Sequence, residues 1–144
     1  MPIYNLESVL NCYDEQYLIL TYEHLFIAST LREEVLLLQK KEDHRLIENV
    51  MTEATGFKLL EVTADRYIDR YSGGQRAILA CLLLIALIRT KNIRAIKILL
   101  NHVLESISAE NRTQLLAKFG EVNITHGTRL FTVDGEQIRE LDLN

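Results

Sequence analysis

The feature that most constrains this chain is an unbroken apolar run at residues 77–88, which lies between Arg76 and Arg89. A helix that is apolar on every side is normally buried on every side. The run is too short to span a bilayer, because a membrane helix needs about 20 apolar residues. The pattern therefore predicts a buried core helix, against which the rest of a globular domain packs.

The start of this helix is marked by Ser72, Gly73, Gly74 and Gln75. Serine is a good N-cap because its hydroxyl accepts hydrogen bonds from the free N–H groups of the first turn. The two glycines allow another molecule to approach the backbone closely. Bare N–H groups and a positive dipole end attract anions, most naturally a phosphate. The motif supports two interpretations, a plain capped core helix and a helix terminus that contacts phosphate.

The composition is that of one ordinary globular domain covering residues 1–144. Apolar residues make up 48% of the chain and charged residues 25%, which is enough for a real core. The net charge of −4 gives no strong nucleic-acid signal, because such surfaces are basic. Cys12 and Cys81 show neither a disulfide framework nor metal-ligand spacing, so we predict no metal site and a buried thiol at Cys81. No signal-peptide pattern opens the chain, and a reducing, cytoplasmic setting fits these features.

The first half of the chain is predicted to hold one strand and several short helices. The strand covers residues 17–20, and the helices cover residues 5–10, residues 31–38 with Ser29 or Thr30 as N-cap, residues 44–54 with Gly56 as C-cap, and residues 63–70. In the last of these helices, Tyr67 and Ile68 are expected to face inward. Glu33 and Glu34 are expected on a solvated helix face.

The second half alternates predicted strands and helices. A buried strand is expected at 93–100, a helix from Ser108 to Gly120, and a short strand at 122–124. Two further strands, at 129–133 and 137–141, flank an Asp-Gly pair, which is a strong hairpin signal. The element order predicts an α/β fold with a helical insertion in the first half.

In this order the motifs resemble those of an ABC-type ATPase domain that is truncated at its N-terminus. Residues 72–76 resemble the signature motif of that family, with Tyr71 where leucine is usual. The other matching positions are Asn101 and His102 in place of the Walker B Asp-Glu, 105–108 at the D-loop, Thr125 and His126 at the switch histidine, 129–138 at the closing hairpin, and Leu20 at the Q-loop glutamine. Residues 26–35 are similar to the segment after the Q-loop in vitamin- and metal-uptake importers, which favours the transport branch.

The resemblance implies a partial ABC fold, with a helical signature part at about 25–90 and a small sheet with a C-terminal hairpin at 91–144. The chain contains no GxxxxGK(S/T) motif, so ATP is expected only as a ligand shared with the P-loop of a partner. Asn101 lacks the charge that holds Mg²⁺, and His102 cannot replace a glutamate that polarises water beside a metal. We therefore expect no ATP hydrolysis by the chain alone, and regard Asn101, His102 and His126 as degenerate catalytic positions.

The same resemblance implies that Ser72, Gly73, Gly74 and Gln75 contact, in trans, ATP held by another subunit. That partner would be an intact ABC ATPase or a second copy in a homodimer, with a membrane permease as a further partner at the inner face of the membrane. Two alternatives remain open: a scaffold or regulator without nucleotide contact, and a relative of DNA-repair and chromosome-organising ABC ATPases. The acidic net charge and the absence of coiled-coil arms count against the second. Without the P-loop strand, either the remaining strands close up or an apolar sheet edge is left open, and an open edge also favours association.

Overall fold

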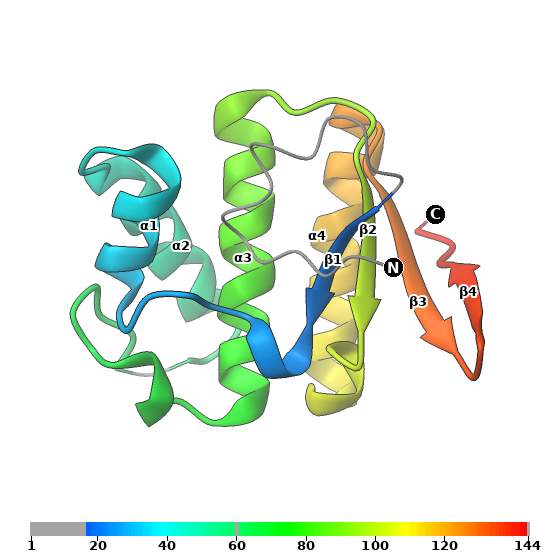
Figure 1. Cartoon of the computed structure of the whole chain (residues 1–144), viewed down its shortest axis with the longest axis horizontal. Helices are drawn as coiled ribbons and strands as arrows, with labels where there is room; N and C mark the ends of the chain where they lie inside the picture. Colours follow the sequence, from blue (N-terminus) through cyan, green and yellow to red (C-terminus); the bar gives the residue numbers. More distant parts are fainter. Residues whose placement is uncertain (1–16, 60, 144) are drawn as a thin grey trace.

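The computed structural model describes residues 17–59 and 61–143, which form a mixed α/β fold (Figure 1). The predicted helix at 5–10 and Cys12 lie outside the described residues. The elements are β1 (Leu18–Thr21), α1 (Leu31–Gln39), α2 (His44–Gly56), α3 (Gly73–Lys91), β2 (Lys97–Asn101), α4 (Ala109–His126), β3 (Arg129–Asp134) and β4 (Gln137–Glu140). Short 3₁₀ turns cover Tyr22–His24, Ile68–Arg70 and Leu104–Ser106.

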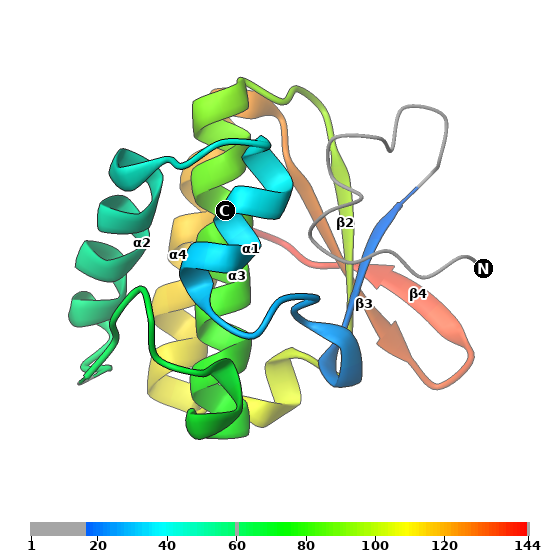
Figure 2. The same ribbon diagram turned by 60° about the vertical axis from the view of Figure 1, so that its left-hand side comes forward.

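The four described strands form one sheet in the order β1-β2-β3-β4, with β1, β2 and β3 parallel and β4 antiparallel to β3. Figure 2 shows α3 and α4 on one face of this sheet and the pair α1 and α2 beyond α3. Side chains alternate between the two faces along each strand. Leu18 and Leu20 join the main core under the helices, whereas Ile19, Leu99 and Phe131 form a second cluster on the opposite face.

Helix α3 is the centre of the core, as the apolar run predicted. Every residue at 77–88 except Ala86 is buried. Among the described helices, α3 alone has the length and apolar character of a membrane span, but most of it is buried inside the fold. It is therefore the core helix of this domain, between α2 on one side and α4 with the sheet on the other.

The first half agrees with most of the predicted elements. Strand β1 and helix α2 are confirmed, and Thr30 caps α1 by accepting a hydrogen bond from the N–H of Glu33 (3.1 Å). The prediction of Gly56 as a C-cap is wrong by one residue, because the helix includes Gly56 and Phe57 follows as the cap.

The predicted helix at 63–70 is replaced by a single 3₁₀ turn, Ile68–Arg70. Tyr67 is extended and forms an isolated antiparallel bridge with Thr30, so no helix can run through it. Ile68 is buried as expected, but Tyr67 is 58% exposed and does not face inward. Pairing with the distant Thr30 therefore overrides the local helical pattern.

The solvated face predicted for Glu33 and Glu34 is correct only for Glu33. Glu34 is fully buried, and its Oε1 accepts hydrogen bonds from the N–H groups of Ile27 (2.9 Å) and Ala28 (2.7 Å). A buried carboxylate needs such donors to replace its lost hydration. Glu34 is thus a structural clamp on the segment that precedes α1.

In the second half, α4 continues six residues past the predicted stop at Gly120 and includes the expected strand at 122–124. Gly120 marks a close approach instead, because a Cβ there would lie 3.0 Å from the carbonyl oxygen of Leu143. The true C-cap is Gly127, at φ +70°. Strand β2 begins at Lys97 rather than at residue 93, since Ala95 is left-handed (φ +58°) and cannot belong to a strand.

The C-terminal hairpin is confirmed. Asp134 pairs with Gln137, and Gly135 has the positive φ (+63°) that a two-residue hairpin loop requires. At the opposite edge of the described sheet, all four residues of β1 are buried. Among the described strands, β1 pairs with β2 alone.

Candidate functional site

The topology collects the sequence-predicted motif at one end of the sheet. Strands β1, β2 and β3 point the same way, and α3 and α4 both begin at the end where these strands finish (Figure 1). Ligands of α/β proteins commonly bind at the carboxyl ends of parallel strands. The N-termini of α3 and α4, the Tyr22–His24 turn after β1, and Asn101 and His102 after β2 all lie at this end.

The N-terminus of α3 is a complete capping box. Ser72 Oγ accepts a hydrogen bond from the N–H of Gln75 (3.2 Å), and Gln75 Oε1 accepts one from the N–H of Ser72 (2.9 Å). The N–H groups of Gly73 and Gly74 have no acceptor among the described residues. Ser72 is exposed, and the other three residues are half-buried. The positive end of the helix dipole therefore remains available to an anion.

Both glycines of the motif are also required by packing within the chain. A Cβ on Gly73 would overlap the hydroxyl of Tyr22, and a Cβ on Gly74 would lie 2.7 Å from the carbonyl oxygen of Ser106. Neither Tyr22 nor Ser106 was predicted to touch the motif, and no local signal in the sequence could have shown this contact. The side faces of the turn are thus occupied internally, and only its N–H face is left for a ligand.

A cavity of about 370 Å³ lies beside this N-terminus and is lined by residues of both long helices. Ser72 and Gln75 contribute from α3, and Ser108 contributes from α4, where its Oγ accepts a hydrogen bond from the N–H of Asn111 (3.3 Å). Lys58, at the rim, forms a long ion pair with Glu110 (3.9 Å), and both side chains are exposed. Exposed ion pairs contribute little energy. The positive potential in the cavity therefore comes mainly from the N-termini of α3 and α4.

Asn101 and His102 end β2 at the same edge. Asn101 is in register with Thr21 of β1, whose Oγ1 is buried without a hydrogen-bond partner among the described residues. His102 follows in a left-handed conformation (φ +59°), and its Nδ1 lies 2.9 Å from Oε2 of Glu105. Both side chains of this pair are well exposed. Within residues 17–59 and 61–143, no three His, Cys, Asp or Glu side chains gather as metal ligands.

The structure does not bring His126 to this edge. His126 is the last residue of α4, and its carbonyl oxygen accepts a hydrogen bond from the N–H of Ala95 (2.8 Å), which precedes β2. His102 follows β2, so the length of a strand separates the two histidines. The side chain of His126 is engaged locally, with Nδ1 2.7 Å from Oγ1 of Thr125. The strand that was expected to lead to His126 is part of α4, which explains the difference in position.

The remaining motif positions have structural roles. Leu20 is fully buried and packs in the main core, so its side chain cannot reach a ligand. Residues 105–108 form the end of a 3₁₀ turn and the N-cap of α4. Of the sequence-predicted residues, the structure therefore places Ser72–Gln75 at the same end of the sheet as Asn101 and His102. It buries Leu20 in the core and places His126 at the other end.

No protein-family model matches this chain, and a search of curated proteins finds no significant relative. The resemblance to ABC-type ATPases consequently rests on the order of the motifs alone. The fold itself is α/β, with the Ser-Gly-Gly-Gln turn at the carboxyl end of the three parallel strands of a mixed sheet.

Proposed function

We propose that this chain is a non-catalytic, ABC-type subunit that presents the N-terminus of α3 to a nucleotide phosphate bound by a partner ATPase. The observation that carries the proposal is the pair of unpaired backbone N–H groups at Gly73 and Gly74 among the described residues, next to the hydroxyl of Ser72. Backbone N–H groups, a hydroxyl and a positive dipole end are what a phosphate prefers at a helix terminus. The position of this turn at the carboxyl edge of the sheet is consistent with a ligand-facing role.

The chemistry of hydrolysis would belong to the partner. These 144 residues contain no P-loop lysine motif, and Asn101 and His102 supply neither a metal ligand with negative charge nor a carboxylate base. The exposed pair formed by His102 and Glu105 lies at this end of the sheet, but it belongs to no cluster of three metal-ligating side chains among the described residues. Contact with ATP held by a partner requires fewer functional groups than hydrolysis, because α3 would add hydrogen bonds only to the outer phosphate.

The partner that fits best is an intact ABC ATPase subunit. A homodimer would place two signature turns opposite two chains that both lack the P-loop motif in these residues. In a transport system, such a pair of subunits would lie at the cytoplasmic face of the membrane and would contact a permease. This arrangement, together with the localisation and the transport role, is part of the proposal.

One observation favours the scaffold alternative. Tyr22 and Ser106 both press against the glycine turn, so glycine is needed there whether or not a phosphate ever binds. A chain that had lost all nucleotide contact would keep the same sequence for the sake of packing. The two functions therefore differ in whether the N–H groups of the turn contact a phosphate, whereas both require the two glycines.

Binding of a fluorescent ATP analogue distinguishes these functions. We expect no saturable binding and no steady-state phosphate release from the chain alone. With an intact ABC ATPase subunit of the same organism, we expect a complex whose analogue affinity exceeds that of the ATPase alone. Phosphate release by the pure chain that disappears in His102→Ala would contradict the proposal. A complex whose analogue affinity equals that of the free ATPase would favour the scaffold.

A further inference from the structure

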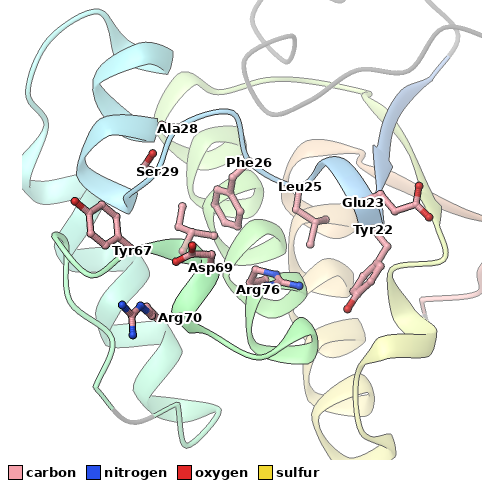
Figure 3. Close-up of a pocket in the computed structure, with 11 residues that line it drawn as sticks. Tyr22, Glu23, Leu25, Phe26, Ala28, Ser29, Tyr67, Asp69, Arg70 and Arg76 are labelled. Atoms are coloured by element: carbon pink, nitrogen blue, oxygen red, sulfur yellow. The ribbon is translucent and has the colours of Figure 1, made fainter.

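We propose that a second cavity, on the other side of the α3 N-terminus, binds a small organic monoanion with an apolar body, such as an aryl or branched-alkyl carboxylate. The cavity measures about 790 Å³, which is within the usual range for small-molecule sites (Figure 3). Its walls come from the segment after β1, the turn at 67–70, and Arg76 of α3. This inference does not rest on the proposed function, because the N–H face of Ser72–Gln75 takes no part in it.

The cavity wall formed by the segment before α1 is fixed by hydrogen bonds to a buried side chain. The buried carboxylate of Glu34 accepts hydrogen bonds from the N–H groups of Ile27 and Ala28, which fixes the backbone beside Phe26. The facing turn is tied to the same segment, since the N–H of Ile68 donates to the carbonyl oxygen of Ser29 (2.8 Å). The cavity is therefore preformed, and a ligand would not have to order its walls.

Arg70 and Arg76 both line the cavity, Arg70 from an exposed position at its rim and Arg76 as the more buried positive group. Arg76 is half-buried, and among the described residues its guanidinium makes one hydrogen bond, from Nη1 to the carbonyl oxygen of Tyr71 (3.3 Å). No carboxylate of the described residues lies within ion-pair distance of it, in contrast to Arg32 with Asp65 (2.7 Å) and Arg66 with Glu61 (3.0 Å). An arginine left with free donors in a partly desolvated position is suited to a planar carboxylate, which it binds through two parallel hydrogen bonds.

The charge of the ligand is limited by two acidic side chains. Glu23 and Asp69 also line the cavity, and both are exposed at its rim beside Arg70, so the rim carries one more negative than positive charge. Like charges at short range oppose binding, so these carboxylates select against di- and triphosphates. One negative charge, placed at Arg76, is therefore the best match.

Apart from the charged groups and Ser29, the lining of the cavity is apolar or aromatic. Leu25 and Ile68 are buried, and Phe26 is half-buried against the core. Figure 3 shows Phe26 and Leu25 above Arg76, with Tyr22 and Tyr67 at the two ends of the group. Such a surface buries an aryl or branched-alkyl body, while the tyrosine hydroxyls offer polar contacts at its edges.

Titrations with benzoate, phenyl phosphate and benzyl alcohol test this assignment by protein-observed NMR. The three probes share a similar body and carry one, about two and no negative charges at neutral pH. We expect benzoate to shift the amide signals of Phe26, Ser29 and Ile68 saturably. Benzyl alcohol should bind about tenfold more weakly, the loss expected for a missing charged hydrogen bond. Equal binding of benzyl alcohol, or tighter binding of phenyl phosphate than of benzoate, would overturn the proposal.

Matched variants then test whether Arg76 is the positive group that binds the carboxylate of benzoate. Arg76→Gln should weaken benzoate binding about tenfold, for the same reason. Arg45→Gln removes an equal charge from an exposed position on α2 and should leave benzoate affinity unchanged. Glu23→Gln removes a rim carboxylate without touching the core, and should strengthen benzoate binding. If Arg45→Gln weakens binding as much as Arg76→Gln, or if Glu23→Gln weakens it, the site is not the one described.

Discussion

Helices α3 and α4 share their local start signals but differ in what surrounds them. They have 19 and 18 residues, each begins after a serine N-cap, and both begin at the carboxyl end of the sheet. In α3, 11 residues are buried and the helix is apolar on all sides, whereas α4 buries only four residues along one face. The capping residue thus decides where each helix starts, while its neighbours decide how much of it is core. Paired substitutions in the two helices test this difference.

The largest effect is expected from a charge in the centre of α3. Leu83 is fully buried, and Leu83→Asp should cost on the order of 5 kcal/mol, comparable with the whole stability of a small domain. The matched change Ile124→Asp in α4, at a residue that is 78% exposed, should cost less than about 1 kcal/mol. Circular dichroism during thermal unfolding measures both. A cooperatively melting Leu83→Asp protein would contradict the central position of α3.

A smaller effect on stability is expected from alanine substitutions at the glycines where a backbone carbonyl packs closely against each helix. Gly74→Ala places a methyl group 2.7 Å from the rigid carbonyl of Ser106 and should cost about 2 kcal/mol. Gly120→Ala in α4 meets the carbonyl of Leu143 at 3.0 Å, and alanine recovers about 1 kcal/mol of helix propensity there. We therefore expect Gly120→Ala to be nearly neutral. Urea denaturation midpoints give both values, and a larger loss in Gly120→Ala than in Gly74→Ala would reverse the ranking.

The N-caps of α3 and α4 should contribute equally to the free energy of unfolding. Ser72→Ala and Ser108→Ala each remove one hydrogen bond to an N–H group of the first turn, at 3.2 and 3.3 Å. Each change should cost about 1 kcal/mol, the usual value for an N-cap serine. Chemical unfolding of the two variants under identical conditions checks this. A cost for Ser72→Ala that is several times larger would mean that its capping box holds the fold more strongly than its geometry indicates.

The smallest effect at neutral pH concerns the thiol in α3. Burial raises the pKa of Cys81 from 9.0 to about 12, so the thiol stays protonated in the folded protein. Its contribution to stability is complete below about pH 9 and is lost as the pH rises toward 12. In a Cys12→Ser background, Cys81 should not react with a disulfide reagent at pH 8, whereas an added Ile124→Cys on α4 should react at once. Rapid labelling of native Cys81 would show that α3 is not enclosed.

The helix comparison also explains which parts of the fold the sequence could predict. The apolar run of α3 and the Asp-Gly hairpin carry strong local signals, and both elements were predicted correctly. In α4, Gly120 imitates a C-cap, but its real partner is the carbonyl of Leu143, which no local pattern reveals. The same holds for Tyr67, which pairs with Thr30, and for Glu34, which looked solvated yet clamps a loop. These errors all arise from tertiary contacts. Gly120 and Tyr67 contact residues distant in the sequence, and Glu34 contacts a loop six or seven residues before it.

The candidate site was predictable to a similar degree. Ser72 as N-cap and the capping box with Gln75 follow directly from residue spacing, and the structure confirms the cap. The contacts of Tyr22 and Ser106 with the glycines required the tertiary structure. His126 was grouped with the other motif positions through the resemblance to the switch histidine, and α4 instead carries it to the opposite end of the sheet.

ATP turnover by an intact partner ATPase, measured with this chain or its matched cap variants, tests the central claim most directly. The account predicts that Ser72→Ala lowers the stimulated turnover about tenfold, because a hydroxyl bonded to a charged phosphate is lost. It predicts that Asp43→Ala, which removes the N-cap of α2 and lies outside the candidate site, leaves turnover at the level of the unaltered chain. Equal turnover with both variants would contradict a phosphate contact at the N-terminus of α3.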